Sequence, residues 1–332
     1  MFTKETGWLL PASAVQNRII TKEDKGYMFT INEGESKSFR ILIKHVEEKK
    51  GTKNTYVNVT FTDGETELSA NAWCPASEFP YTGQIVDITL VMKNGYINIR
   101  SAIPVPTEDP SKYLRHAPID SDSGMAMIYH YISEMNDQDL KIVTEYLIKQ
   151  NEDKFKRWTA AKSVHHNYLN GLLYHICRRI ANVKNLSSVY ALNKDLLMSA
   201  AILHDIGKLR ELKMDELGSA EYTMEGNLYG HLYLGTIMIK EACNVCMVNE
   251  NSQNIQLLIH MILSHHGKME YGAVKTPATR EAYVLHILDE LDSKLWIYED
   301  VMKNTEPGTF SQPNRWLDGA IVYNSDVNLN SR

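Results

Sequence analysis

The sequence contains few cysteines and no long apolar run. Its cysteines, Cys74, Cys177, Cys243 and Cys246, are too few and too scattered for a disulfide framework, which agrees with a reducing compartment. No apolar stretch approaches the roughly 20 residues of a membrane span. The first residues also lack a basic segment followed by an apolar one. We therefore expect a cytoplasmic protein that does not enter a membrane.

An excess of basic residues is also absent. With 35 Lys and Arg against 41 Asp and Glu, the net charge is −6, which argues against strong non-specific attraction to nucleic acid. This balance does not exclude an enzyme that holds a polyanion through metal ions and a few local cations. The 332 residues, 43% hydrophobic and 23% charged, are ordinary globular material and long enough for two domains.

The first third of the chain has the periodicity of β-strands. Residues 1–36 are weakly patterned and are expected to form an irregular lead-in. Between 37 and 103, apolar and polar residues alternate, which predicts strands at 39–46, 56–61, 67–73, 84–91 and 96–100. Five short strands fit a small barrel of the OB type, a fold that binds single-stranded nucleic acids. A proline-rich linker is expected at 104–120.

This barrel carries residues suited to a nucleic acid. Tyr56, Phe61, Trp73 and Tyr96 could stack on bases, and Lys44 is one of several cations that could follow a phosphate backbone. The alternative is that half of these aromatic residues form the barrel core and that the lysines are solvated. We favour nucleic-acid binding, with Trp73 and Lys44 as contact residues.

Beyond the linker, the pattern changes to that of an all-α domain at 121–302. Leu, Ile and Met recur at helical spacing in seven segments, at 124–135, 138–152, 164–183, 195–205, 228–245, 252–266 and 280–302. The remaining residues, 303–332, are expected to form a tail with one strand at 315–323. The predicted fold is therefore multidomain α and β, with a five-stranded OB-like barrel followed by a helical domain.

The helix predicted to end at His204-Asp205 is apolar on more than one face, which indicates that it is buried. An imidazole and a carboxylate are costly to desolvate there unless a metal ion or a dense hydrogen-bond network compensates. Adjacent helical positions diverge by about 100°, so the pair suits two metal ions with the carboxylate as a bridge. Gly207 would end the helix, and Lys208 would place a cation where a substrate phosphate could meet it.

Other histidines and acids lie on or at the ends of different apolar helices. They are His165, His166, His175, His231, His265, His266, Asp289 and Asp292. Any one of these histidines alone is better explained as a hydrogen-bonded residue. The whole set instead predicts a divalent metal centre of one or two ions, because imidazole and carboxylate together suit Mn²⁺, Fe²⁺, Co²⁺ or Zn²⁺. Two such ions activate a water and neutralise a phosphate ester, which predicts phosphoester hydrolysis.

These motifs resemble the HD-domain metal-dependent phosphohydrolase superfamily, whose signature is His, His-Asp and Asp on separate helices. The barrel ahead of the helical domain and the segments around His175, His204-Asp205, His231 and His265-His266 are similar to the YhaM-type 3′-5′ exoribonucleases. The resemblance implies hydrolysis of single-stranded RNA from its 3′ end, with single-stranded DNA as a further substrate. It also implies one or two Mn²⁺ ions, with Co²⁺, Fe²⁺ or Zn²⁺ as alternatives, and a homo-oligomer.

The resemblance also implies roles for individual residues. The implied metal ligands are His175, His204, Asp205, His231, His265, His266 and Asp289. His204, Asp205 and Lys208 are the implied catalytic residues. Lys208, His165 and His166 are expected to contact the phosphate. Asp292, one helical turn from Asp289, is either a hydrogen-bond partner of a ligand or a surface acid.

Two other functions remain open from the sequence. A nucleotide or cyclic-dinucleotide phosphodiesterase could use the same metal centre, although Gly267-Lys268-Met269 stands where the cyclic-di-GMP members carry Gly-Tyr-Pro, and the barrel favours a polymer. A catalytically inactive HD protein that only binds nucleic acid is the alternative from another class. The presence of every ligand type together with Lys208 argues for an active enzyme.

Overall fold

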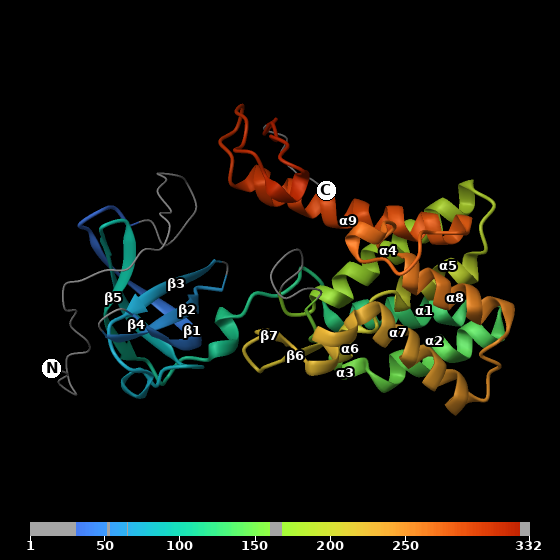
Figure 1. Ribbon diagram of the computed structural model, residues 1–332, viewed down its shortest axis with the longest axis horizontal. Helices are drawn as coiled ribbons and strands as arrows, with labels where there is room; N and C mark the ends of the chain where they lie inside the picture. The colour runs from blue at the N-terminus through green and yellow to red at the C-terminus, as the bar shows by residue number, and fades with distance from the viewer. Residues whose placement is uncertain (1–30, 52–53, 65, 160–167, 326–332) are drawn as a thin grey trace. The chain divides into compact units, whose positions relative to one another are not determined.

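The computed structural model describes residues 31–51, 54–64, 66–159 and 168–325 (Figure 1). The chain divides into two compact units. One unit contains the described residues up to Arg115 together with Glu216–Ser219, and the other contains His116–Asp215 and the described residues from Ala220 onwards. The first unit is a β-barrel and the second is built of helices. None of the described helices is both long and apolar enough to cross a membrane.

The barrel is closed and five-stranded, as the sequence predicts. Its strands are β1 (Ser36–Lys50), β2 (Thr55–Thr62), β3 (Glu67–Ala72), β4 (Ile85–Lys93) and β5 (Tyr96–Pro104). They follow the order β1-β2-β3-β5-β4, and neighbours are antiparallel except β3 and β5, which pair in parallel. Short 3₁₀ helices lie at Ala76–Glu78 and Pro110–Tyr113.

Alternating residues of the strands fill the barrel. Ile41, Val59, Phe61 and Ile88 are among the fully buried side chains of this core. The pairing register of β1 with β2 shifts between Ile43 and His45, and a bulge of this kind bends a strand around a barrel. Because Phe61 is fully buried, it is a core residue and is not available to stack on a base.

The second unit is built of helices and one short hairpin. The helices are α1 (Ser121–Ser133), α2 (Gln138–Gln150), α3 (Glu152–Phe155), α4 (Gly171–Val189), α5 (Lys194–Leu203), α6 (Lys208–Glu211), α7 (Met224–Cys246), α8 (Gln253–Ser264) and α9 (Arg280–Lys303). The hairpin consists of β6 (Leu212–Met214) and β7 (Ala220–Tyr222). Further 3₁₀ helices lie at Met269–Tyr271 and Arg315–Leu317.

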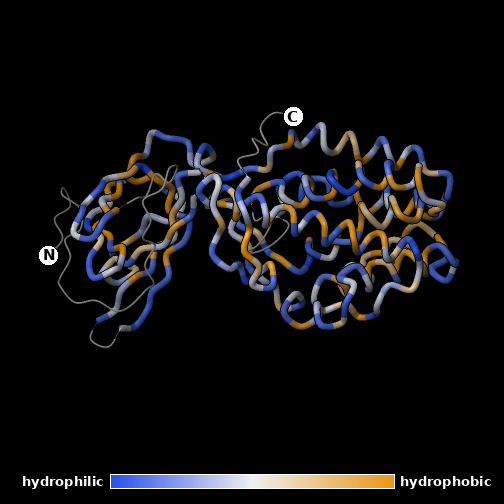
Figure 2. The backbone as a smooth tube through the Cα atoms, turned by 90° about the horizontal axis from the view of Figure 1, so that it is seen from above, coloured by the Kyte–Doolittle hydropathy of each residue, from blue (hydrophilic) through white to orange (hydrophobic). Residues whose placement is uncertain are grey.

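Helix α5 lies at the centre of this unit. Every residue from Leu196 to Leu203 is buried, and α5 packs against α1, α2, α4, α8 and α9. Figure 2 shows hydrophobic and hydrophilic residues alternating along these helices, as expected for helices that bury one face. Side-chain caps at Asp120, Asp137, Asn193 and Thr223 begin α1, α2, α5 and α7. A buried central helix therefore delivers its last residues to the interior.

Some predicted elements differ from those observed. The helix predicted at 164–183 begins in the described part at Gly171, after Asn170 in a left-handed conformation (φ 63°). The strand predicted at 315–323 is wrong, because Arg315–Leu317 forms a 3₁₀ helix and only single bridges, Asn314 with Ala320 and Phe310 with Tyr323, lie around it. Packing of Leu317 and Val322 against Ile297 and Val301 of α9 explains the apolar pattern there.

Candidate metal centre

The side chains predicted as metal ligands all come from the helical unit. His175 lies on α4, and Asp289 lies on α9. His204 and His265 occupy the C-terminal caps of α5 and α8, so that Asp205 and His266 follow directly after these helices. His231 lies within α7, immediately after a kink at Gly230. Five separate helices therefore contribute to one region of the interior.

The first group of ligand atoms comprises His175, His204 and Asp205, all buried. His204 Nε2 lies 3.2 Å and His175 Nε2 lies 3.5 Å from Asp205 Oδ2. Asp289 Oδ1 lies 3.6 Å from His175 Nε2. The four side chains expected to bind the first ion from the His, His-Asp, Asp signature thus converge. We call His175, His204, Asp205 and Asp289 the first cluster.

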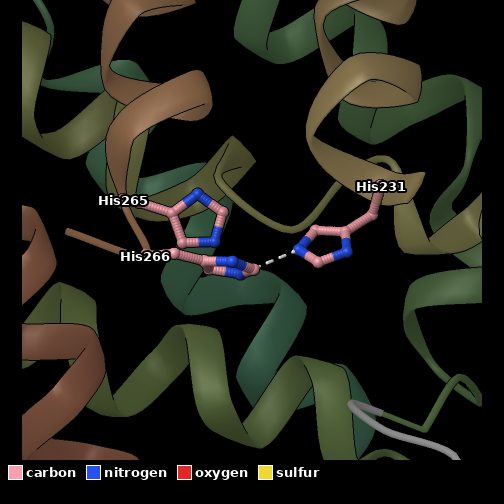
Figure 3. Close-up of side chains that lie close together, drawn as sticks. All are labelled: His231, His265 and His266. Atoms are coloured by element: carbon pink, nitrogen blue, oxygen red, sulfur yellow. Dashed lines mark hydrogen bonds between the residues drawn. The ribbon is translucent and has the colours of Figure 1, made fainter. Parts of the chain in front are cut away.

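The second cluster comprises His231, His265 and His266, which are drawn in Figure 3. His231 Nε2 lies 3.2 Å from His266 Nε2. The other oxygen of Asp205, Oδ1, lies 3.6 Å from His231 Nε2 and 3.7 Å from His265 Nε2. Asp205 thus directs one oxygen to each cluster, so it would be able to contribute a donor to both.

Each histidine of the two clusters has a hydrogen-bond acceptor at Nδ1. The acceptors are Asp292 for His175, the Ala201 carbonyl for His204, Glu211 for His231, the Ile262 carbonyl for His265 and the Tyr271 carbonyl for His266. An acceptor at Nδ1 assigns the proton to that nitrogen and leaves the Nε2 lone pair free for a metal. All of these Nε2 atoms face the interior of the site.

A divalent metal ion fits these donors. The buried atoms His204 Nε2 and Asp205 Oδ1 have no hydrogen-bond partner among the described residues, and an unsatisfied buried polar atom is costly. The Nε2 atoms of His231 and His266 face each other although both bear lone pairs, an arrangement that a cation between them would stabilise. Imidazole and carboxylate donors suit Mn²⁺, Fe²⁺, Co²⁺ or Zn²⁺.

Burial and a neighbouring lysine set the protonation of three proposed ligands, His204, His265 and Asp205. Burial lowers the pKa of His204 to about 4 and holds the pKa of His265 well below its usual range, so both imidazoles are neutral at pH 7. Burial opposes the ionisation of Asp205, but the positive charge of Lys208 outweighs it and holds the pKa of that carboxyl well below its usual range. These three side chains are therefore in the forms that bind a metal ion.

Four charged residues, Lys208, Asp292, Arg178 and Arg179, contact the ligands or their hydrogen-bond partners. Lys208 Nζ lies 2.8 Å from Asp205 Oδ2. Asp292 Oδ2 lies 2.8 Å from His175 Nδ1, and Arg178 pairs with the other oxygen of Asp292, so Asp292 is a hydrogen-bond partner of His175 and not a surface acid. Arg179 is fully buried and pairs with Asp289.

Sequence reasoning missed Arg179 and Glu211. Arg179 follows His175 by one helical turn on an apolar face of α4. This position in the helical pattern could have indicated that its charge is buried. Glu211 ends the short helix α6 and reaches His231 of α7, a contact between segments that no local pattern indicates. Both residues contact members of the clusters.

The residues expected to contact the substrate are only partly described. His165 and His166 lie outside the described residues. Trp73 lies in the barrel unit, where its ring packs on Tyr56 at 5.1 Å between centroids and its Nε1 donates to Asn98 Oδ1. Lys44 also lies in the barrel, and its Nζ is paired at 2.6 Å with Glu67.

Comparison with known proteins agrees with this site. The family model described as HD domain matches residues 172–294, a range that includes both clusters. The 3′-5′ exoribonuclease YhaM of Listeria innocua is 33% identical over 306 residues, which cover 88% of this chain and 96% of that protein. The chain belongs to the YhaM family.

Two further relatives carry the same name. The 3′-5′ exoribonuclease YhaM of Bacillus pumilus is 31% identical over 90% of this chain and 98% of its own length. That of Bacillus subtilis is 30% identical over 81% of this chain and 88% of its own length. No solved structure matches the chain. The resemblance to HD-domain hydrolases and to YhaM-type enzymes, which the motifs indicate, is confirmed.

Proposed function

We propose that this protein is a metal-dependent 3′-5′ exoribonuclease that hydrolyses the phosphodiester bonds of single-stranded RNA. The observation that carries the proposal is Asp205, which directs one oxygen to each of two histidine clusters. The relatives named as 3′-5′ exoribonucleases span most of the chain and support the choice of reaction and substrate. The direction of digestion rests on these relatives alone.

The ligand roles follow from the clusters. His175, His204, Asp205 and Asp289 would hold one ion, and His231, His265 and His266 would hold a second, with Asp205 shared. When bound, a pair of divalent ions activates a water for attack and neutralises the oxygens of a phosphate ester. We assign Mn²⁺ as the ion, with Co²⁺, Fe²⁺ or Zn²⁺ as alternatives that the same donors accept.

Lys208 and the barrel would act on the substrate. The Nζ atom of Lys208 is placed to donate to an oxygen of the scissile phosphate, where its fixed positive charge stabilises the charge that develops during attack. His165 and His166 are proposed as further phosphate contacts. Trp73 would stack on a base and Lys44 would contact the backbone, with single-stranded DNA as a second substrate. Free cysteines at all four positions support a reducing, cytoplasmic location.

The test of this function uses single-stranded RNA labelled at its 5′ end. With Mn²⁺ present, the wild type is expected to give a ladder that shortens from the 3′ end, and a chelator is expected to abolish it. Asp205→Asn removes the shared anionic ligand and is expected to abolish the ladder, whereas the matched control Asp300→Asn, an exposed acid of α9, is expected to retain it. A folded, metal-loaded wild type that cleaves neither RNA nor DNA would contradict the proposal.

We also propose that the protein forms a homodimer through α9. Between residues 281 and 298 the exposed positions are all large apolar side chains, namely Tyr283, Ile287, Leu291, Leu295 and Tyr298, which we call the α9 stripe. These side chains are 39–60% exposed although a surface helix normally presents polar residues to water. Their spacing of three or four residues forms one continuous ridge that a second helix can pack against.

A second copy of the chain fits the α9 stripe better than an unrelated surface. Read in either direction, the stripe has an aromatic residue at each end and aliphatic residues between, so an antiparallel pairing about Leu291 matches it to itself. Glu290 and Lys294 border the same edge of the stripe, and this pairing would bring Lys294 of one copy, whose Nζ also donates to the Trp316 carbonyl at 2.9 Å, beside Glu290 of the partner subunit. The charges are therefore complementary as well.

A further inference from the structure

Helix α7 is broken immediately before His231. Gly230 has φ 71° and ψ 161°, a backbone conformation that is essentially confined to glycine. The kink makes His231 the first residue of the second segment of α7, where a backbone N–H lacks its usual helical acceptor. The break therefore turns a residue in mid-helix into a helix start, which requires an acceptor from elsewhere in the chain.

Glu211 supplies that acceptor and also holds the imidazole. Its Oε1 atom accepts from the backbone N–H of His231 at 3.0 Å and from His231 Nδ1 at 3.1 Å. The Glu211 side chain is only 11% exposed, so little water competes for these bonds. One carboxylate oxygen thus fixes both the main chain and the ring of a proposed ligand.

The backbone of Glu211 is itself held against α7. The N–H of Thr223 donates to the Glu211 carbonyl at 2.9 Å. A Cβ atom at Gly226 would lie 2.2 Å from the same carbonyl oxygen, so only glycine permits this approach. The position of Glu211 is therefore set by the start of α7, and the position of His231 is set by Glu211.

We propose that Glu211 is the positioning residue of the second cluster and decides whether the protein binds its second metal ion. This inference rests on the proposed function only for the identity of the site as a two-metal centre. A carboxylate that accepts from Nδ1 orients a ligand imidazole and raises the basicity of its Nε2 atom. The first cluster has a separate carboxylate for this purpose, because His175 Nδ1 is paired with Asp292.

Loss of Glu211 is therefore expected to weaken one site and spare the other. In Glu211→Ala, the His231 ring loses its acceptor, and the affinity for the second Mn²⁺ ion is expected to fall about 10-fold to 100-fold. Glu211→Gln retains an oxygen acceptor without the charge, and its affinity is expected to lie between those of the wild type and the alanine variant. The first ion is expected to bind all three proteins equally.

The experiment measures Mn²⁺ binding to the metal-free full chain by isothermal titration calorimetry and records electron paramagnetic resonance spectra at saturation of the wild type. The wild type is expected to bind two ions with the spectrum of an exchange-coupled pair. At the same Mn²⁺ concentration, Glu211→Ala is expected to give the spectrum of an isolated ion. Glu241→Gln, an exposed acid paired with Arg210, is the matched control and is expected to behave as the wild type.

Circular dichroism in chelator checks that each variant is folded, and Glu211→Gln carries the test if the alanine variant is not. Wild-type binding of both ions by the folded Glu211 variants would overturn the inference. Equal weakening of both sites, or a wild type that binds one ion, would overturn it too. A wild type that binds two ions, depends on Glu211 for the second and yet leaves RNA intact would refute the proposed nuclease function while supporting the role of Glu211.

Discussion

Lys208 and Asp205 form an ion pair, in which each group partly compensates the charge of the other. Lys208 Nζ lies 2.8 Å from Asp205 Oδ2, and the lysine side chain is mostly buried. Once a carboxylate is shared between two ions, its attraction for the lysine falls, and the ammonium group becomes available to an anionic substrate. Lys208 is thus suited to bind a substrate phosphate, and it is not a ligand of the metal.

Lys208→Ala tests whether Lys208 acts on the substrate phosphate and not on the metal. Removing one preorganised donor from a developing oxyanion costs roughly 100-fold to 1,000-fold in kcat. We expect a loss of this size in RNA hydrolysis, measured under saturating Mn²⁺, with two ions still bound per chain. Lys213→Ala, which removes an exposed lysine nearby in sequence, serves as control and should keep full activity. Loss of bound metal in Lys208→Ala would instead make the lysine a structural member of the site.

At this scale, the convergence of the ligands could be predicted because each interrupts an apolar helical pattern. His204 and Asp205 end a run in which every residue is buried, so they had to lie in the interior. Arg179 and Glu211 could not be assigned, because their partners Asp289 and His231 are 110 and 20 residues away in sequence. The ligand roles stay predictions until metal binding is measured.

At the scale of elements, α6 and α7 approach so closely that side chains are excluded between them. A Cβ atom at Gly207 would lie 2.0 Å from the His231 carbonyl oxygen and 2.6 Å from the backbone nitrogen of Gly235. The prediction that Gly207 ends a helix is wrong, because α5 ends at Leu203 and Gly207 is the N-terminal cap of α6 in a right-handed conformation (φ −62°). The reason for glycine at this position is the contact with α7, which only tertiary packing could reveal.

Gly207→Ala tests this contact. Overpacking of a tight interface costs about 1–3 kcal/mol, so the free energy of unfolding in chelator is expected to fall by that amount in a urea titration. Gly235→Ala is the matched control on the facing helix, because its nearest neighbours lie at 3.4 Å. A Gly207→Ala protein as stable as the wild type would show that α6 and α7 can move apart freely.

The kink in α7 had no reliable signal in the sequence. The sequence predicts one uninterrupted helix at 228–245, which includes Gly230. The observed α7 begins at Met224 and bends at that glycine. An isolated glycine in a helical pattern is compatible with both a straight and a broken helix. The acceptor from Glu211 makes the broken form stable, and it comes from another element.

At the scale of the whole molecule, α9 carries residues of both proposals on its two faces. Its buried face carries Asp289 and Asp292 at the metal centre, and its exposed face carries the α9 stripe. Pairing of two α9 helices would therefore brace the element that holds two carboxylates of the site. Composition alone could not identify this interface, because the apolar residues of α9 are arranged so that both faces are hydrophobic.

Sedimentation equilibrium of the full chain tests the dimer. The wild type is expected to sediment as a dimer, and Leu291→Lys is expected to raise the dissociation constant by at least about 100-fold, because burial of a leucine contributes roughly 1.5–3 kcal/mol in each copy. Val245→Lys, at another exposed apolar position, is the control and should remain dimeric. A monomeric wild type, or a dimer that tolerates Leu291→Lys, would contradict the pairing.

The charges at the edge of the stripe give an independent check. Glu290→Lys places like charges opposite each other and is expected to weaken the dimer, whereas the double variant Glu290→Lys with Lys294→Glu is expected to recover it. Recovery requires that the partner surface is α9 itself. Failure to recover would point to the barrel unit or another protein as the occupant of the stripe.

The acceptor at Nδ1 determines whether the orientation of a histidine can be changed by substituting another residue. His204, His265 and His266 rely on the main-chain carbonyls of Ala201, Ile262 and Tyr271, which every amino acid provides. The orientation of these three imidazoles therefore does not depend on which amino acid stands at the acceptor position. His175 and His231 rely on the carboxylates Asp292 and Glu211, so we expect substitutions at these two positions to change the affinity of each proposed ion site separately while every proposed ligand stays in place.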